Sequence, residues 1–570
     1  MSDLLLDPIR VEILWNRFKG IVDEQATVLM RTAFTNILSD AGDLAAGVFD
    51  AQGRMIAQAM VGTPGHVNTM ATGMKHFLDA YPAESLQPGD VLICNDSHKF
   101  SGHLNDLTVA TPAFADGKLV GYLASCCHAL DIGGIGFGPE GRNRFEEGLY
   151  IPMLKFMEAG EPNHDLHSII RGNVRTPEEV MGDLHAQVTA NGVGARRLVE
   201  LMSEFELDEL APIADEIISR TETAMRKAIS DLPDGAYENV LVCDGWDDPI
   251  EIKCQVRIKG DEVEIDFTGT ADEAKFGINV PLSYATAYAT YGLKIVICPD
   301  VPNNEGSFRP IRVIAPEGCL LNCSLNAPVA AKHMMGHFAS ECVTLSLGDL
   351  VPKRAIAEGA NTVWNIQAGG QWSGGKPFML VSMMAGGMGA RSSSDGLSAV
   401  TFPSGTKGTA VEIVETLSPL VIKKKELRID SGGAGKHRGG LGQDVHLGIR
   451  SDADWTFTSM FDRIDIPPKG KLGGQPGMGG HAELDDGTPF APKGKYSIHQ
   501  DRTLIMQIPG GGGFGNPLER DPEKVCKDVR DGTVSLENAR EAYGVVLSDD
   551  ATQVDVPATE HARAEMSGAA

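Results

Sequence analysis

Apolar residues recur at helical spacing near the start of the chain and at strand spacing farther on. Between residues 9 and 22 they follow the three-to-four-residue period of a helix, and the pair Asp7-Pro8 before them is typical of a helix start. This first helix, or a broken pair of helices, is predicted to end near Phe34. From about Gly235 apolar and polar residues alternate, which predicts a β-rich region. Further helices are predicted over residues 67–80, 178–191, 194–205 and 211–229.

Two apolar runs predict a β-hairpin in the N-terminal part of the chain. Residues 107–114 and 119–128 flank Asp116-Gly117, and an Asp-Gly pair between apolar runs is a strong hairpin signal. With the turn at this pair, His128 is expected opposite Asn105. The hairpin therefore returns a histidine from the end of its second strand to the start of its first.

The chain is too long for one hydrophobic core, and shifts in composition divide it. Its 570 residues exceed the roughly 250–300 at which a single core stops growing. We predict a multidomain fold of the α+β class, mixing helices and strands, without a simple barrel or Rossmann signature. The predicted parts are an N-terminal α+β domain over 1–234 that carries the candidate metal site, a mixed β-rich domain over 235–419, a glycine-rich β and loop region with two short helices over 420–547, and a disordered tail over 548–570.

Charge and targeting signals narrow the class of function. Acidic residues outnumber basic ones by 77 to 50, and the net charge of −27 argues against binding to nucleic acid or to an anionic membrane. The N-terminus lacks a signal-peptide pattern, and no apolar run is long enough to span a bilayer. The ten cysteines lack disulfide-scaffold spacing, and the adjacent Cys126 and Cys127 would face opposite sides of one strand. A cytoplasmic protein with reduced thiols is therefore expected.

Glycine is unusually frequent, with 66 residues, but its clusters do not form a nucleotide-binding motif. The run over 509–515 resembles a phosphate-binding loop in composition, yet it lacks the Gly-Lys-Ser/Thr ending of that motif. It also does not join a strand to a helix with the acidic residue of a dinucleotide site. Backbone crowding or the close approach of another chain explains these clusters better.

The clearest candidate chemistry is a His-x-x-Asp segment with a later histidine. The predicted hairpin brings His128 beside Asp106 and within one or two residues of His103. Two imidazoles and one carboxylate suit a divalent cation such as Zn²⁺, Mn²⁺ or Fe²⁺. A fourth ligand is expected from Asp40 or Asp43 in the polar turn that precedes the first strand. The alternative interpretation is structural, with Asp106 capping a strand and the histidines hydrogen-bonded in the core.

Three further histidines carry weaker signals. His66 follows Pro64-Gly65 in a loop and would suit the orientation of a substrate, although a lone histidine is more often structural. His333 and His337 are four residues apart and share a helix face, but no glutamate lies between them in the manner of the zinc proteases. Surface or packing roles are therefore predicted for this pair.

A series of short motifs occurs in order along the chain, in segments 43–54, 88–91, 95–96, 103–106, 128–134, 147–149, 173–177, 266–270, 308–310, 431–435, 438–442 and 509–515. Together these segments resemble the hydantoinase B/oxoprolinase family. The resemblance covers nearly the whole chain, from Asp7-Pro8 to residues 543–547. It implies the B-type subunit of an ATP-dependent cyclic-amide hydrolase, working with a separate hydantoinase A-type subunit that binds ATP-Mg, in a hetero-oligomer of both types.

The resemblance also implies a metal-ligand set. Related ketone carboxylases hold a divalent metal on an acid, a His-x-x-Asp pair and a later histidine, and His103, Asp106 and His128 match this pattern. Asp43 aligns with the acid of the family's N-terminal strand and is narrowly favoured over Asp40 as the remaining ligand.

The implied function is ring opening of a hydantoin, 5-oxoproline or a similar cyclic amide after its activation by ATP on the partner. A metal-activated water would attack the phosphorylated amide. His66 and Asp96 are candidates to orient the substrate or move a proton, and Asp131 is a candidate to fix a histidine tautomer. One alternative is a subunit of an ATP-dependent ketone carboxylase of the acetone or acetophenone type. A third hypothesis is a non-catalytic scaffold for the A-type partner.

Overall fold

The computed structural model describes residues 7–361 and 363–568, which form a mixed α/β protein containing four β-sheets. The chain has two compact units, each built from more than one stretch of sequence. The middle of the chain contributes to both units. Unit 1 contains the residues up to Asn239, Ile252–Val343 and Ser404–Thr406, and unit 2 contains Val240–Glu251, Thr344–Pro403 and the residues from Lys407 on.

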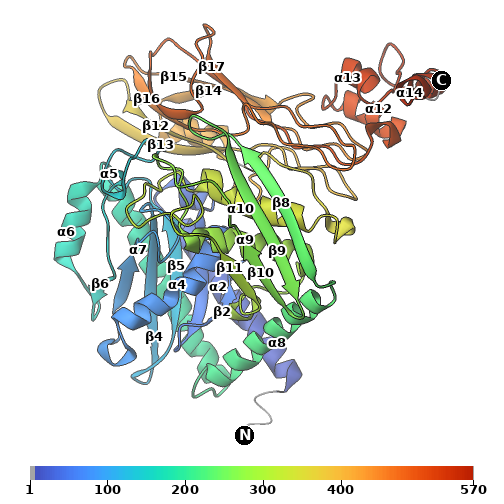
Figure 1. The fold of residues 1–570 in the computed structure, drawn as a ribbon. Helices are drawn as coiled ribbons and strands as arrows, with labels where there is room; N and C mark the ends of the chain where they lie inside the picture. The colour runs from blue at the N-terminus through green and yellow to red at the C-terminus, as the bar shows by residue number, and fades with distance from the viewer. Residues whose placement is uncertain (1–6, 362, 569–570) are drawn as a thin grey trace. The chain divides into compact units, whose positions relative to one another are not determined.

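The centre of unit 1 is a seven-stranded antiparallel sheet, drawn from blue to cyan in Figure 1. Its strand order is β2-β1-β5-β4-β3-β6-β7, so the predicted hairpin β4–β5 lies in the middle of the sheet. The strands are β1 (Leu44–Asp50), β2 (Met55–Gln58), β3 (Val91–Cys94), β4 (Asp106–Ala115), β5 (Lys118–His128), β6 (Leu154–Glu158) and β7 (Glu161–Pro162).

Helices cover both faces of this sheet because its central strands are apolar on both sides. Alternate residues of β4 point in opposite directions, so Val109 packs toward α7 while Ala110 packs toward α4. Cys126 lies in the cluster beneath α4, which agrees with the predicted opposite orientation of Cys127. The helices in the same part of the chain as this sheet are α2 (Pro8–Thr32), α3 (Asn36–Ser39), α4 (Pro64–Ala80), α5 (Arg144–Glu147), α6 (His164–Asn173) and α7 (Pro177–Glu204).

The remainder of unit 1 supplies a second sheet and three further helices. In this sheet β10 pairs antiparallel with β9 and parallel with β11. Helix α9 packs on α4, and α10 begins directly after Lys332. The elements are α8 (Ala211–Ser230), β8 (Gly235–Cys243), β9 (Ile250–Lys259), β10 (Glu262–Asp266), α9 (Leu282–Ile297), β11 (Ile311–Ile314) and α10 (His333–Ser346), of which β8, β9 and α10 extend into unit 2.

Unit 2 is built on two four-stranded antiparallel sheets that share one core. Trp364, Phe457, Leu447 and Met506 are fully buried in this core, and they come from both sheets. The orders are β13-β12-β16-β18 and β14-β15-β19-β17. The elements are β12 (Trp364–Gln371), β13 (Pro377–Met384), α11 (Val411–Leu417), β14 (Leu420–Leu427), β15 (Gln443–Ile449), β16 (Trp455–Met460), β17 (His481–Leu484), β18 (Lys493–Ile498) and β19 (Leu504–Gln507).

The glycine clusters of unit 2 pack backbone against backbone. The Gly511 amide donates a hydrogen bond to the Gly440 carbonyl (2.9 Å), and the Gly433 amide donates to the Gly511 carbonyl (2.8 Å). A Cβ atom on Gly439 would lie 1.9 Å from the Gly511 carbonyl oxygen. Segments far apart in sequence therefore approach more closely than any side chain allows, and the crowding predicted for these clusters occurs within the chain itself.

The C-terminal segment differs from its prediction. Residues 548–570 are predicted to be disordered, and 569–570 lie outside the described residues, but the rest contains α14 (Val556–Met566), which follows α12 (Pro522–Arg530) and α13 (Leu536–Glu541). Asp555 caps α14 by accepting the Ala558 amide, and the Arg563 guanidinium donates to the carbonyl oxygens of Tyr543 and Arg520. A cap and an arginine bound to distant carbonyls hold this polar segment, and composition alone carries no sign of such bonds.

Two further observations bear on the sequence predictions. All ten cysteines are free thiols, and every one except Cys298 is buried. No helix in the described part of the chain is both long enough and apolar enough to cross a membrane.

Candidate metal centre

The β4–β5 hairpin places His128 directly opposite Asp106. The predicted partner of His128, Asn105, is one residue away from the observed one. The difference arises because a β-bulge between Ala113 and Phe114 shifts the register by one residue. The bulge therefore pairs the two candidate ligands across the strands.

His103 reaches the same point from the loop before β4, as the three-residue spacing to Asp106 requires. Gly102 turns this loop with φ +89°, and a Cβ atom there would lie 2.6 Å from the Lys332 side chain. Ligand atoms of His103, Asp106 and His128 all lie within 4.8 Å of one another, and all three side chains are buried. These three residues are called the histidine group below.

Neighbouring oxygen atoms hold the Nδ1 atom of each of the two histidine rings. His103 Nδ1 donates to the Ala330 carbonyl (2.8 Å), and His128 Nδ1 faces Asp106 Oδ1 at 3.2 Å. Among the described residues, the buried Nε2 atom of His128 has no hydrogen-bond partner, and the His103 Nε2 atom lies 2.7 Å from the Asp106 carboxylate. Phe137 packs edge-on against both rings, with centroids 5.8 and 4.8 Å away. Two lone pairs and a carboxylate oxygen thus converge in a buried site, which fits a metal ion.

His66 joins this group from the first turn of α4. Its Nε2 atom lies 3.0 Å from Asp106 Oδ2, and its Nδ1 atom lies 3.6 Å from Asp43 Oδ1. The helix start positions the ring, because Thr63 Oγ1 accepts the His66 amide hydrogen. The Asp40 carboxylate instead accepts a hydrogen bond from Ser39 Oγ (2.8 Å). The structure therefore brings the carboxylate of Asp43, rather than that of Asp40, to His66.

Lys332 is a member of the site that sequence reasoning missed. Its buried ammonium lies 2.8 Å from Asp106 Oδ2 and 4.4 Å from the centre of the Tyr284 ring. A lysine is rarely buried unless it is paired. The available sequence signal was its position inside the apolar stretch 329–335, where a solvated lysine would be out of place.

The Asp106 carboxylate divides its two oxygens between two sets of neighbours. Oδ2 faces Lys332 and His66, while Oδ1 lies 2.7 Å from His103 Nε2 and also faces His128. This arrangement holds the carboxylate in one orientation, with Oδ1 directed toward His103 Nε2 and His128 Nδ1.

The charges around Asp106 determine the protonation of the group. Burial alone would raise the pKa of Asp106, but the surrounding imidazoles and the Lys332 ammonium hold it well below its usual range. Burial lowers the pKa of His103 to about 4, so its ring is neutral near pH 7. Burial also opposes a charge on His66, yet the Asp106 and Asp43 carboxylates raise its pKa above the ordinary value. An anionic carboxylate beside a neutral His103 is the state that a metal ion requires.

Asp96 and Asp131 hydrogen-bond within neighbouring loops rather than to the histidine rings. Asp96 accepts the Tyr150 hydroxyl hydrogen bond at 3.0 Å. Asp131 accepts bonds from the Gly133 amide (3.0 Å) and the Arg175 guanidinium (2.7 Å). The tautomer of His103 is held by the Ala330 carbonyl, which is the role expected of Asp131.

His333 and His337 are buried, with exposed fractions of 7% and 2%. The surface role predicted as one option for this pair is therefore wrong. The His333 ring lies 5.8 Å from Phe137, and His337 Nε2 lies 3.5 Å from the Tyr284 hydroxyl. Both rings pack among aromatic residues that also contact the histidine group or Lys332.

Glu147 is a second buried residue that sequence reasoning did not select for the site. Its Oε1 atom accepts the amide hydrogens of Val329 (2.6 Å) and Ala330 (2.7 Å), and only 2% of the residue is exposed. Burial raises the pKa of Glu147 to about 8, although these two amides oppose the shift. The Ala330 carbonyl fixes His103. A neutral Glu147 therefore helps to position His103 by holding the backbone of Ala330. Its local sequence carries no chemical signal, because its partners lie 182 and 183 residues away in the chain.

Substitution of Glu147 by glutamine is expected to stabilise unit 1 at alkaline pH. An unfolded glutamate ionises near pH 4.5, whereas Glu147 in the folded chain holds its proton up to about pH 8. Between these values unfolding releases a proton, so stability falls as the pH rises. Glu147→Gln removes that proton while keeping the acceptor oxygen, and it should be more stable than wild type at pH 8 by on the order of 2 kcal/mol.

Urea unfolding at pH 5, 6, 7 and 8, followed by circular dichroism, measures this difference. The advantage of Glu147→Gln should widen steadily from pH 5 to pH 8. The exposed Glu161→Gln variant serves as the control and should follow wild type. A constant difference across this range would contradict a protonated Glu147.

The fold and the site together define a class: a mixed α/β protein of several sheets with a buried His/Asp/His group that suits a metal ion. The profile of the hydantoinase B/oxoprolinase family matches residues 7–517. The chain therefore belongs to the hydantoinase B/oxoprolinase family, as its motifs predict.

Two relatives align along nearly their whole length. One is described as a candidate D-/L-hydantoinase B subunit of Pseudomonas sp. (strain NS671), and it is 29% identical over 98% of both chains. The other is the β subunit of the caprolactamase of Pseudomonas jessenii, 28% identical over 98% of this chain and 99% of the relative. Both are named as subunits.

Two solved structures share the fold. The ATP-dependent caprolactamase from Pseudomonas jessenii is 27% identical, with a TM-score of 0.89 over 98% of this chain and 100% of that chain. A nucleotide-free acetone carboxylase is 22% identical, with a TM-score of 0.90 over 100% of this chain and 84% of that chain. At that lower identity, the second likeness shows the fold alone.

Proposed function

We propose that the chain is the metal-bearing B-type subunit of an ATP-dependent hydrolase that opens a cyclic amide. The observation that carries this proposal is the buried histidine group, in a chain that aligns end to end with one subunit of a hydantoinase and one of a caprolactamase. Family membership supports the ATP-dependent amide chemistry, and the subunit names of the relatives support a partner.

His103, Asp106 and His128 would hold the metal, Zn²⁺, Mn²⁺ or Fe²⁺, with Asp43 as a further carboxylate close by. When bound, such an ion supplies Lewis acidity and lowers the pKa of water. The Ala330 carbonyl keeps the His103 lone pair on Nε2. Lys332 holds the other Asp106 oxygen, so that the carboxylate is oriented before a ligand arrives.

His66 is the proposed proton carrier of the site. It bridges Asp106 and Asp43, and these two carboxylates favour its protonated form. A proton held on His66 would be available to the ring nitrogen as the amide bond breaks. Asp96 and Asp131 are proposed to act on loops rather than on the reacting atoms.

The activation of the amide is assigned to the partner. An unstrained amide is a poor electrophile, and this chain has no recognised nucleotide-binding motif in its sequence. We therefore expect an A-type subunit to bind ATP-Mg and phosphorylate the amide oxygen, and the two chains to form a hetero-oligomer. In the ketone carboxylase hypothesis, a partner subunit would likewise use ATP to activate the substrate. The similarity to the acetone carboxylase supports only a shared fold.

Asp106→Asn in the assembled complex is expected to lower the rate of ATP-dependent ring opening by about 100-fold or more, without preventing assembly. The amide removes the negative charge that the metal and Lys332 require, while its shape stays nearly the same. The measurement is turnover of hydantoin, 5-oxoproline and caprolactam by the chain co-expressed with its genomic neighbour, with assembly followed by gel filtration.

Asp116→Asn makes the same chemical change at the far end of the same hairpin and should keep full turnover, because asparagine suits that turn. Wild-type turnover retained in an assembled Asp106→Asn complex would favour a scaffold instead. A bicarbonate-dependent carboxylated product from a ketone, without ring opening of any amide, would favour the carboxylase.

A further inference from the structure

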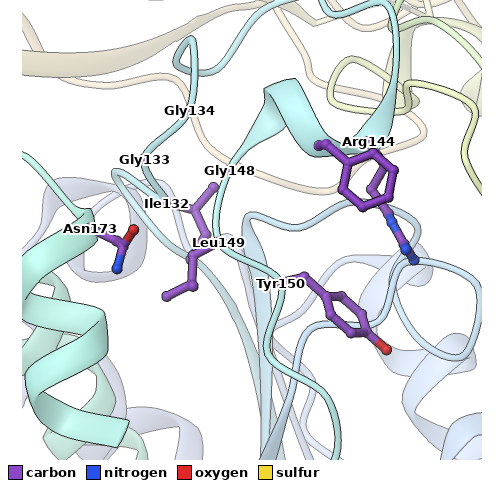
Figure 2. A pocket seen from close by; sticks show the side chains of 9 residues that line it. Ile132, Gly133, Gly134, Arg144, Gly148, Leu149, Tyr150 and Asn173 are labelled. Atoms are coloured by element: carbon purple, nitrogen blue, oxygen red, sulfur yellow. The ribbon is translucent and has the colours of Figure 1, made fainter.

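Unit 1 contains a cavity of about 330 Å³ that none of the histidine-group residues lines. Its walls come from residues 132–134 and 148–150, from Arg144 and Phe145, and from Asn173. Figure 2 shows Arg144 and Tyr150 on one side and Asn173 on the other, with Ile132 and Leu149 between them. Its volume is within the usual range for small-molecule sites.

Arg144 is the charged side chain of this cavity, and it has no anionic partner among the described residues. None of them forms an ion pair or a side-chain hydrogen bond with its guanidinium, and its Nε atom is buried without a partner. The guanidinium lies over the rings of Tyr150 (4.8 Å) and Phe145 (5.5 Å). Only its backbone is tied down, by a bond from the amide to the Asn326 carbonyl (3.1 Å). A positioned guanidinium with unused donors is a site for an oxyanion.

The acidic groups around the cavity are already engaged and do not neutralise Arg144. Asp96 is bound by the Tyr150 hydroxyl and by Lys99 (3.7 Å). Glu146 accepts the Arg142 amide hydrogen, and Glu147 is neutral below about pH 8 because burial raises its pKa. Arg144 therefore lines the cavity as a cation that no carboxylate pairs with among the described residues, although the whole chain carries −27.

The opposite wall of the cavity is held by Asp131, which the sequence analysis selects as a candidate site residue. Asp131 binds the Gly133 amide and the Arg175 guanidinium, and Arg175 in turn donates to the carbonyl of Gly133 and to that of Gly134. These bonds occupy the carbonyl oxygens of the glycine wall, which would otherwise repel an anion. Asp96 and Asp131 thus each hold one wall of the same cavity.

We propose that this cavity binds the oxyanion of a small cyclic ligand, with Arg144 as its anchor and the Tyr150 and Phe145 rings against the ligand ring. The proposal rests on the proposed function and names its substrate class: a cyclic amide that carries a carboxylate, or a phosphate after activation. Arg144 would then determine specificity for acidic over uncharged lactams.

The test is isothermal titration of the purified chain with three probes. These are 5-oxoproline, 2-pyrrolidinone, which is the same ring without the carboxylate, and inorganic phosphate. Wild type should bind 5-oxoproline about tenfold or more tightly than 2-pyrrolidinone, and Arg144→Gln should remove that difference. Arg144→Lys should give an intermediate affinity, because it keeps the charge and loses the planar donors. Arg142→Gln, an equal charge change on an exposed neighbour, should match wild type.

The outcomes separate the two sources of the oxyanion. Phosphate binding without 5-oxoproline binding, lost in Arg144→Gln, supports the site and assigns it to the activated intermediate. Binding of neither anion, or equal affinities in folded Arg144→Gln and wild type, overturns the proposal. The titration needs no ATP, metal or partner, so its failure would leave the proposed ring-opening function standing.

Discussion

His128→Ala is expected to purify with almost none of the divalent metal that the wild-type chain retains, and to support no ATP-dependent ring opening in the complex. The substitution removes the His128 Nε2 atom, which has no hydrogen-bond partner among the described residues, and leaves two ligands of the histidine group. Loss of an outer partner alone typically weakens metal binding 10- to 100-fold, so removal of a ligand should exceed about 100-fold. Inductively coupled plasma analysis of both proteins after metal-supplemented expression measures the loss.

The exposed His164→Ala variant provides the matched control and should keep the metal content of wild type. Equal, near-zero metal in wild type and His128→Ala would remove the basis for the metal assignment. Full metal occupancy in both proteins would show that the metal binds elsewhere in the chain.

Gly439→Ala is expected to destabilise unit 2 so strongly that little soluble protein is recovered. The added Cβ atom would lie 1.9 Å from the Gly511 carbonyl oxygen, 2.6 Å from its carbonyl carbon and 3.0 Å from the Gly433 amide nitrogen. All three are backbone atoms, so no side chain can rotate away. Ordinary overpacking costs about 1–3 kcal/mol, and a clash with hydrogen-bonded backbone should cost more.

Soluble yield and the urea midpoint of unit 2 measure this effect. Gly408→Ala is the control within the same unit, because its nearest neighbour would be 3.7 Å away and the position is exposed. A Gly439→Ala protein as stable as Gly408→Ala would show that the glycine segments can separate without loss of the fold.

The histidine group could be predicted because its chemistry is local to one hairpin. The Asp-Gly turn and the lengths of the two strands nearly determine which residues meet, and the error was a single residue. That error came from a β-bulge, which depends on how the strands pack in the sheet rather than on the turn. The fourth acid was ambiguous for a different reason, since Asp40 and Asp43 lie in the same short turn and only its path separates them.

The rest of the site could not be predicted, because it comes from distant parts of the chain. Lys332 lies 226 residues from Asp106 in sequence, yet its ammonium is 2.8 Å from the carboxylate. The periodic pattern of apolar residues does not show which helix N-terminus will contact which hairpin. The same limit applies to Glu147, whose partners are backbone amides that carry no residue identity.

By itself, the sequence determined the helix and hairpin pattern of the N-terminal part, the His103, Asp106 and His128 constellation, and membership in the hydantoinase B/oxoprolinase family. These follow from short spacings and local turn chemistry. Only the tertiary structure decided that His66 and Lys332 share the Asp106 carboxylate, that Asp96 and Asp131 brace the cavity of Arg144, and that the surplus glycine packs within unit 2. The physical reason is that burial, pairing of charges and backbone contact depend on long-range packing, which a linear pattern does not contain.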